Sequence, residues 1–416
     1  MWSRPIPRFS PTFSPLELRA TLRSALPGGA GTVCEFESSF ASYIGAKNAV
    51  MTSSARVGLY LLLEAWGLEP GDEVLIPSLT YFAIPSVVLA LGLKPVFVDV
   101  GRDTYVIDPE DLERKVGPRA KVIIPTHLYG FPCDMVAVRD VASRHGLRVV
   151  EDVAQATGAR FGGKPVGSFG DASYYTFGLT KNITTLKGAM ITTDDDELAA
   201  KVRSRVEAGI RLGFRSLIKE AAVGTAMMAV TRPWLFPFTL YPFIRVQGVV
   251  GRDYLEEAFG EPQVRYDDVP GWFFTTSPGD TQAAVGLRQL VRIDGLNALR
   301  ASHGSYLLEH LSNGDGYILP KLVATGEPVF MSFPLQVPDP EDVKARLLVE
   351  GVDTARGYMS SCADMEIYSG RVGGEGQCPN ALAIEKQILH IPVHPNLSRA
   401  DLGHLVEAVR RATNPK

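Results

Sequence analysis

The chain has 416 residues, of which 45% are hydrophobic and 21% are charged, and its net charge is −4. That composition excludes an intrinsically disordered chain and suffices for one large and one smaller domain. A weakly acidic chain also gives no support for nucleic acid as the main partner.

The cysteines and the N-terminus bear on the compartment. Four cysteines lack the close spacing of zinc or thiol-redox motifs: Cys34, Cys133, Cys362 and Cys378. We therefore expect free thiols in a reducing cytosol. The first fifteen residues are interrupted by prolines and contain no apolar signal-peptide core. We expect a cytoplasmic protein rather than a secreted one.

The first predicted elements are a helix at 36–45, where aromatic residues recur at helical spacing, and a short strand at 49–51. A second helix follows this strand. Thr52, Ser53 and Ser54 are candidates for its N-cap because each has a side-chain oxygen directly before the apolar helical pattern.

Beyond residue 74, short β-branched strands alternate with helical stretches; the strands lie at 74–77, 95–100, 121–130 and 147–155. This alternation predicts an α/β fold, with a three-layer large domain built on a mainly parallel sheet. Ligands of such sheets bind at the carboxyl ends of the strands, and EDVAQ at 151–155 lies at one such end. Two further strands are expected around a loop, at 172–182 and 188–198.

The sequence pattern changes twice in the second half of the chain. A nearly uncharged segment interrupts the α/β pattern, and alternating strands and helices then return, which predicts a smaller α/β C-terminal domain. We divide the chain into an N-terminal arm (1–30), a large domain (31–209), an apolar insertion (210–270) and a small C-terminal domain (271–416).

Asp152 and Lys181 are the first candidates for chemistry. They lie on consecutive strand-end loops of the predicted sheet, so both loops can open into one pocket. Enzymes that use pyridoxal 5′-phosphate (PLP) need a lysine amine and a carboxylate on the ring nitrogen, together with groups for the phosphate, the ring face and the phenolic oxygen. Each residue alone could be a solvated surface side chain, but the pair is more informative.

The stretch EDVAQATGARFGGKPVGSFGDASYYTFGLTKNITTLKGA resembles the signature of the DegT/StrS family of PLP-dependent sugar aminotransferases, which have fold type I. That family shows E-D-x-A-Q-x-x-G, then G-S-x-G-D, then S-F-x-x-x-K-N. All three elements are present, with Thr176 in place of the serine. The likeness extends to 70–83, 95–113 and 281–290, and covers most of the chain outside 210–270.

The resemblance implies a role for each matching position. Lys181 would be the aldimine lysine and the proton carrier, and Asp152 would bind the ring nitrogen. Gln155 would meet the phenolic oxygen, Tyr81 would stack on the ring, and Thr176 would contact the phosphate. The large domain (31–209) would then be the PLP-binding domain.

Ala55 and Arg56 stand where the family has Gly-Thr, at the start of a helix. Backbone N–H groups at a helix N-terminus can hold a phosphate, and an arginine there opposes the helix dipole unless it meets an anion. We therefore favour Arg56 as a direct phosphate ligand. Simpler alternatives remain for the side chains, such as core packing for Tyr81 and cross-strand pairing for Thr176.

Two departures from the family pattern concern the substrate. LKGA at 186–189 replaces G-E-G-G, and TTSP at 275–278 replaces N-Y-R-M, so the asparagine that usually reaches the neighbouring subunit's phosphate is absent. These changes weaken the expectation of a standard nucleotide-sugar substrate more than that of PLP.

Other motifs are excluded. No G-x-G-x-x-G follows a strand, so a dinucleotide site is unsupported. His390 and His394 are separated by Pro392 and cannot share a helical face as metal ligands would, so no metal is expected.

The apolar segment at 221–246 follows a basic stretch at 201–219. It is too short and too rich in proline to span a membrane as one helix. Basic residues beside an aromatic-rich segment favour peripheral contact with an anionic membrane surface. A hairpin buried against the large domain or in a dimer interface is the alternative, and the sequence leaves both open.

The leading functional hypothesis is amino transfer from an amino acid, with glutamate expected, to a keto-sugar or related carbonyl metabolite, with pyridoxamine phosphate as intermediate. The resemblance also implies a homodimer. One alternative is a sugar dehydratase, whose relatives in this fold carry histidine in place of Lys181. Another is a non-catalytic binding protein, which should have lost at least one of Asp152, Gln155, Thr176 and Lys181.

Overall fold

The computed structural model of the protein describes residues 4–24, 31–211, 214–250, 276–311, 316–357 and 359–414. Part of the predicted N-terminal arm, the stretch 251–270 of the predicted insertion, and Thr275 lie outside the described residues.

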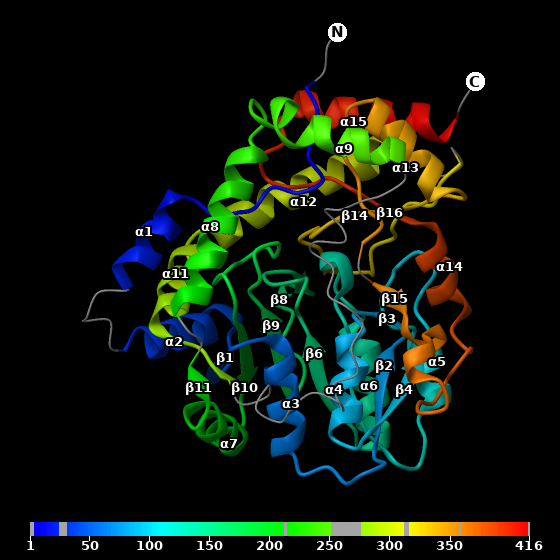
Figure 1. Ribbon diagram of the computed structural model, residues 1–416. Coiled ribbons are helices and arrows are strands. Elements are labelled where there is room, and N and C mark those ends of the chain that lie inside the picture. The colour runs from blue at the N-terminus through cyan, green and yellow to red at the C-terminus, as the bar shows by residue number, and fades with distance from the viewer. Residues whose placement is uncertain are drawn as a thin grey trace.

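A seven-stranded sheet forms the centre of the larger half of the molecule (Figure 1). β10 is antiparallel to both of its neighbours, and the other six strands run in one direction. In spatial order the strands are β1 (Asn48–Thr52), β10 (Ala189–Thr193), β9 (Ala172–Thr176), β6 (Arg148–Asp152), β5 (Ala120–Ile123), β2 (Glu73–Pro77) and β4 (Lys94–Val98).

Helices cover both faces of this sheet. Val50 and Ile191 belong to a buried cluster with α3, α4 and α7, whereas their neighbours Met51 and Met190 belong to a cluster with α2, α5 and α6. That alternation is the period-2 pattern of strands buried on both sides. The helices are α2 (Thr32–Ile44), α3 (Ala55–Ala65), α4 (Ala83–Ala90), α5 (Pro109–Lys115), α6 (Met135–His145) and α7 (Asp196–Glu207).

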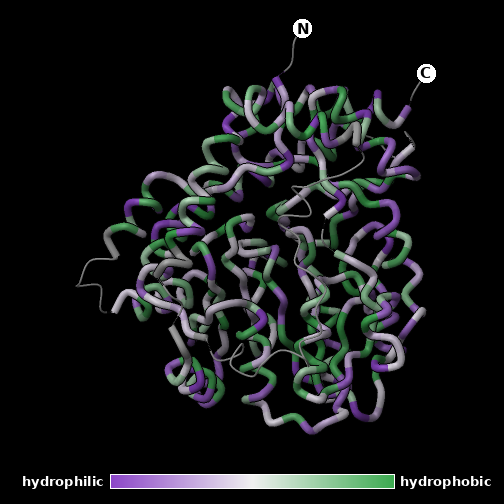
Figure 2. The backbone as a smooth tube through the Cα atoms, in the orientation of Figure 1, coloured by the Kyte–Doolittle hydropathy of each residue, from purple (hydrophilic) through white to green (hydrophobic). Residues whose placement is uncertain are grey.

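The predicted three-layer α/β architecture with a mainly parallel sheet is confirmed. Figure 2 shows hydrophobic residues along the central strands and hydrophilic residues on the outer helices. The predicted start of α3 is also confirmed, because the Ser54 hydroxyl accepts a hydrogen bond from the Val57 N–H at 3.3 Å. At α5, Asp108 caps the helix in the same way, through the Glu110 N–H at 3.0 Å.

The second half of the chain forms a smaller unit above the sheet in Figure 1. β14 and β16 pair antiparallel, and β15 pairs with β3 at the edge of the large unit. The elements are α12 (Ile293–His310), β14 (Phe333–Gln336), α13 (Pro340–Val349), β15 (Ser360–Ser361), α14 (Pro379–Gln387), β16 (Ile388–Ile391), α15 (Arg399–Thr413) and, in the large unit, β3 (Leu79–Thr80). Helix α11 (Asp280–Leu290) precedes α12 and packs on α2 of the large unit.

The N-terminal segment crosses this smaller unit before α1 (Pro15–Ser24) begins. Ile6 forms a parallel bridge with Val352, and Arg8 forms an ion pair with Asp353 at 2.7 Å. Residues far apart in the sequence therefore meet directly above the carboxyl edge of the sheet.

The segment that follows residue 213 forms α8 (Phe214–Val230), the short 3₁₀ helix η2 (Phe236–Phe238) and α9 (Leu240–Val250), so its prolines do break it into separate helices. Ala221, Phe236 and Ile244 are buried. α8 packs against α1, and α9 packs against α13. In the described part of the chain, no helix combines the length and the apolarity needed to cross a membrane.

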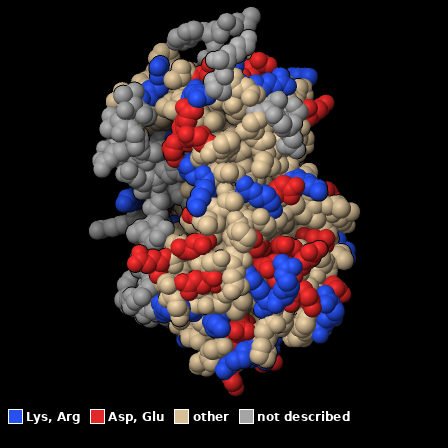
Figure 3. Space-filling model, turned by 90° about the vertical axis from the view of Figure 1, so that its right-hand side faces the viewer, with Lys and Arg blue, Asp and Glu red and all other residues tan. Residues whose placement is uncertain are grey.

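Charged side chains of both signs are intermingled on the face shown in Figure 3. With a net charge of −4, that face offers no continuous basic surface of the kind that binds nucleic acid.

The packing of α11 on α2 gives a test of the fold. A methyl group at Gly286 would lie 2.4–2.8 Å from ring atoms of Phe36. Gly286→Ala is therefore expected to destabilise the protein by about 1–3 kcal/mol in urea unfolding. Gly295→Ala in α12 is the control, because nothing lies within 4 Å of its added methyl group. That control should gain about 0.5–1 kcal/mol from helix propensity, and equal effects of the two changes would contradict the packing.

Candidate active site

Three strand ends define the base of the site. β1 and β9 are both antiparallel to β10, and β6 is parallel to β9, so Thr52, Asp152 and Thr176 end at one edge of the sheet. The loops that leave these strands carry the predicted site residues, as expected for a parallel sheet.

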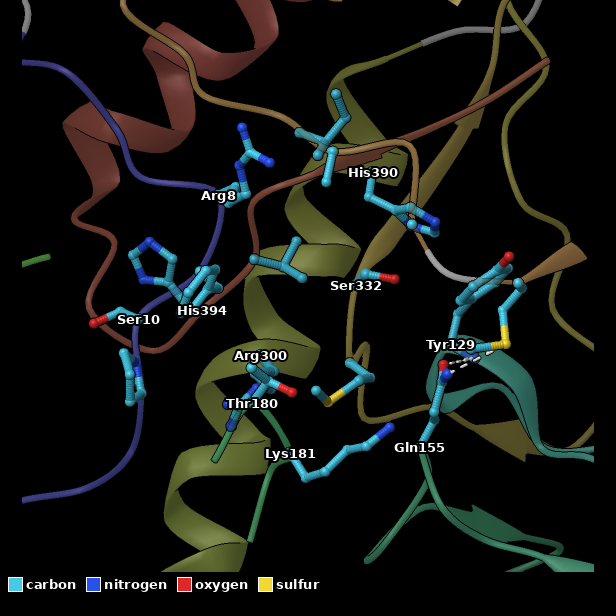
Figure 4. Close-up of a pocket in the computed structure, with 18 residues that line it drawn as sticks. Arg8, Ser10, Tyr129, Gln155, Thr180, Lys181, Arg300, Ser332, His390 and His394 are labelled. Atoms are coloured by element: carbon cyan, nitrogen blue, oxygen red, sulfur yellow. Dashed lines mark hydrogen bonds between the residues drawn. The ribbon is translucent and has the colours of Figure 1, made fainter. Parts of the chain in front are cut away.

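An open cavity of about 160 Å³ lies between this edge, the N-terminal segment and the smaller unit (Figure 4). Its wall combines segments that are remote in the sequence: the N-terminal segment, the loops after β6 and β9, helix α12, and β16 with its following loop. Its polar and aromatic lining residues include Arg8, Ser10, Tyr129, Gln155, Thr180, Lys181, Arg300, Ser332, His390 and His394.

Lys181 extends into the cavity from the loop between β9 and β10, with its amine directed toward the side where Gln155 lies (Figure 4). Burial lowers the pKa of this amine, and the negative charge of Asp152 opposes that shift. A lowered pKa increases the fraction of neutral amine near pH 7, and the neutral amine is the form that attacks a carbonyl carbon.

Asp152 is buried, with 4% of its surface exposed. Burial raises the pKa of its carboxyl, whereas the Ala154 N–H and the positive charge of Lys181 lower it. The Ala154 N–H donates to Oδ1 at 2.9 Å, Thr126 donates a long hydrogen bond to Oδ2 at 3.5 Å, and the buried Tyr174 hydroxyl also interacts with this carboxylate. A carboxylate can accept about four hydrogen bonds, so acceptor sites remain. Asp152 can therefore accept a strong hydrogen bond from a cationic ring N–H, as the pyridinium nitrogen of PLP requires.

Glu151 anchors the strand end from the opposite side. Its fully buried carboxylate accepts hydrogen bonds from the backbone N–H groups of Gly167, Phe169 and Gly170, each at 2.7 Å. His127 Nδ1 accepts the Cys133 N–H at 2.9 Å, so its Nε2 carries the proton and donates to Glu151 at 3.0 Å. One carboxylate thus joins β6, the loop before β9 and the loop after β5.

Gln155 forms part of the cavity wall. Its Oε1 accepts the backbone N–H of Tyr129 at 2.9 Å, which stabilises the left-handed backbone of Tyr129 at φ 57°. Its Nε2 makes only a weak 3.8 Å contact with the sulfur of Met359. This amide N–H is thus available to a ligand oxygen in the cavity.

Asp152 and the four remaining predicted residues lie at the same sheet edge but are not among the cavity's lining residues. Tyr81 is half-buried and packs on the ring of Phe82 at 4.7 Å. Thr176 ends β9 and pairs with Ala189. Ala55 and Arg56 form the first turn of α3. The structure therefore brings Lys181, Gln155 and the charge of Asp152 together, and the roles of these four residues stay predictions.

Residues 16–228 and 275–410 match the model of the DegT/DnrJ/EryC1/StrS aminotransferase family. The chain belongs to this family. It is 31% identical over 408 residues to the spore coat polysaccharide biosynthesis protein SpsC of Bacillus subtilis, covering 95% of this chain and 92% of that protein. It is 31% identical to the GDP-perosamine synthase of Caulobacter vibrioides, covering 91% and 89%.

Solved structures also support membership of this aminotransferase family. DesV of S. venezuelae, in complex with a ketimine intermediate, superposes with a TM-score of 0.76 at 27% identity over 100% of both chains. The resemblance to the DegT/StrS family drawn from the sequence is thereby confirmed, and so is the fold. The family match leaves residues 229–274 unmatched, which include η2 and α9.

Sequence reasoning missed several cavity residues of this DegT-family protein. Arg8 comes from the N-terminal segment and Arg300 from α12, and no local motif marks either one. The sequence excludes His390 and His394 as a metal pair and indicates no other role for them, yet both line the cavity. Only the tertiary arrangement of the smaller unit brings these side chains to the sheet edge.

The Glu151 network predicts a sharp loss of stability on Glu151→Gln. The amide nitrogen cannot accept hydrogen bonds, so at least one buried N–H loses its acceptor, at a cost of about 1–3 kcal/mol each. Urea unfolding measures this loss. Glu113→Gln is the control, because that partly exposed side chain pairs with Arg144 and His145 near the surface and should change stability by less than about 1 kcal/mol. Equal effects would contradict the anchoring role of Glu151.

Proposed function

We propose that this keto-sugar aminotransferase uses PLP, held by Lys181, and takes its amino group from an amino-acid donor, with glutamate preferred. The observation that carries the proposal is the Lys181 amine in the cavity, within electrostatic reach of the buried Asp152 carboxylate. A lysine of lowered pKa and a carboxylate with a free acceptor site are the two groups that PLP chemistry requires of the protein.

Bound PLP supplies an electron sink for the pair of electrons left at the donor's α-carbon. Lys181 Nζ would carry the proton between that carbon and the cofactor, and its lowered pKa suits it to accept and return a proton near neutral pH. Asp152 would keep the ring nitrogen protonated, and the Gln155 N–H would meet the phenolic oxygen. Tyr81 would cover the ring, while Thr176 and the first turn of α3, with Ala55 and Arg56, would hold the phosphate.

The proposed acceptor is a keto-sugar linked to a nucleotide. The relatives support this class, since one of them is named a GDP-perosamine synthase. The sequence LKGA at 186–189 departs from the family's usual G-E-G-G, so the sugar can differ from the usual one while the chemistry of amino transfer stays the same.

Lys181 argues against the alternative of a sugar dehydratase, because such enzymes carry histidine at this position. The intact set of Asp152, Gln155, Thr176 and Lys181 argues against a non-catalytic binding protein.

We place the enzyme in the cytoplasm as a homodimer. All four cysteines are free and three are buried, which fits a reducing compartment. Family membership supports the proposed dimer, and sedimentation equilibrium tests it.

Lys181→Ala is expected to abolish the visible absorbance of lysine-bound PLP and to lower the rate of amino transfer by at least about 100-fold, because it removes the general base as well as the covalent link. Spectra and single-turnover kinetics with glutamate measure both effects. Lys187→Ala is the matched control in the same loop, where Lys187 pairs with Glu220 at 3.0 Å. An unchanged spectrum and rate in Lys181→Ala would refute the proposed function.

A further inference from the structure

Arg300 is a buried cation for which the described residues provide no counter-ion. It lies on α12 and lines the same cavity as Lys181, with 4% of its surface exposed (Figure 4). Its Nη1 is buried without a hydrogen-bond partner, and in the described part of the chain no carboxylate pairs with its guanidinium. A charge buried in this way destabilises a protein unless a ligand neutralises it.

The groups around Arg300 do not neutralise it. Its neighbours His303 and His394 are uncharged near pH 7; burial and then the Arg300 charge lower the pKa of His394 to about 3. His394 Nε2 donates to the Pro7 carbonyl at 3.2 Å, which leaves its Nδ1 without a partner. Burial lowers the pKa of Arg300 to about 10, so the guanidinium remains charged at neutral pH.

Arg8 lines the same cavity but shows the opposite arrangement. Its guanidinium forms two hydrogen bonds to the buried carboxylate of Asp353, at 2.7 and 2.9 Å. The cavity thus contains one neutralised guanidinium and one that is not. The fold can thus place a carboxylate beside a guanidinium in this cavity. Since no described carboxylate pairs with Arg300, a ligand anion can occupy the position next to its guanidinium.

We propose that Arg300 binds the α-carboxylate of the amino-acid donor through a bidentate pair, while the donor's amine meets the cofactor at Lys181. This inference rests on the proposed function, because it needs an amino-acid donor in the cavity. The planar guanidinium suits a carboxylate, and the closed surroundings strengthen the pair. Arg300 is then the residue that selects an amino acid over a simple amine.

The first test is the thermal stability of the PLP-loaded protein without donor. Arg300→Met removes an unpaired buried charge, so its Tm should equal or exceed that of the parent. Arg8→Met is the matched control and should lower Tm, because it leaves Asp353 buried and unpaired. A fall in Tm of Arg300→Met as large as that of Arg8→Met would show a structural role for Arg300 and overturn the proposal.

The second test is the single-turnover half-reaction with glutamate and with alanine. Arg300→Met should keep the visible PLP absorbance of the parent, which separates this result from a failure of the proposed function. The apparent Kd for both amino acids should rise on the order of 10- to 100-fold, and Arg300→Lys should recover part of the loss. If the apparent Kd rises for glutamate but not for alanine, Arg300 binds the side-chain carboxylate of glutamate. If only the half-reaction with the sugar acceptor is impaired, Arg300 binds the acceptor. Either result overturns the proposal.

A different observation, the exposure of large apolar side chains after α8, leads to a second proposal. We propose that the segment 232–246 rests on the surface of an anionic lipid bilayer. Large apolar side chains are exposed along it, with 66% of Trp234 and 81% of Phe238 accessible, and Phe243 and Val246 continue the exposure onto α9. Apolar side chains gathered in this way mark an interaction surface.

The charges beside these side chains indicate the partner. Arg232 and Arg245 are exposed within the segment, and the sequence from 221 to 252 contains no acidic residue. Aromatic side chains flanked by arginines complement a negatively charged interface, where rings enter the headgroup region and guanidinium groups meet phosphates. Residues 229–274, which include this surface, are outside the family match.

Cosedimentation of the full chain with vesicles tests this surface. The protein should bind vesicles of phosphatidylcholine and phosphatidylglycerol in equal parts, bind pure phosphatidylcholine less, and lose binding as salt rises. A Trp234→Ser, Phe238→Ser double variant should lose binding, whereas Val136→Ser, which removes an exposed valine from α6, should keep it. No binding by the intact protein, or a changed oligomeric state in the double variant, would overturn the proposal.

Discussion

The site depends on the buried carboxylate of Glu151. Three backbone N–H groups and His127 donate to it, so the end of β6 is fixed to the loops on either side. Successive side chains of a strand point to opposite faces, and Asp152 is the next residue. Holding Glu151 in place therefore directs the carboxylate of Asp152 toward the other side, where Lys181 lies within electrostatic reach.

A second constraint is electrostatic. Lys181 and Arg300 line the cavity, Asp152 is buried within electrostatic reach of Lys181, and the described residues pair these three groups only in part. Each departs from its ordinary pKa because burial disfavours its charged form. Ligands that supply the missing partners would relieve these penalties, so the same arrangement that destabilises the empty protein favours an anionic substrate and a protonated ring nitrogen. Arg8, which is neutralised by Asp353, shows that the fold can satisfy a charge in this cavity.

Much of the fold and part of the site could be predicted from the sequence. The strand and helix pattern, the N-caps at Ser54 and Asp108, and the motif containing Asp152 and Lys181 are all local signals. The antiparallel direction of β10 left no local signal. Arg300 could not be recognised either, because its significance is that no carboxylate of the described residues pairs with it, and this depends on tertiary packing. Nor did the sequence reveal the N-terminal segment as a cavity wall.

The central claim is that Lys181 holds PLP. Borohydride reduction of the PLP-loaded protein, followed by peptide mapping with mass spectrometry, tests this most directly because reduction fixes the cofactor to the lysine that binds it. Lys181 should carry the label in stoichiometric amount, and Lys187 in the same loop should carry none. A label on Lys187 or on another lysine, with Lys181 unmodified, would contradict the account.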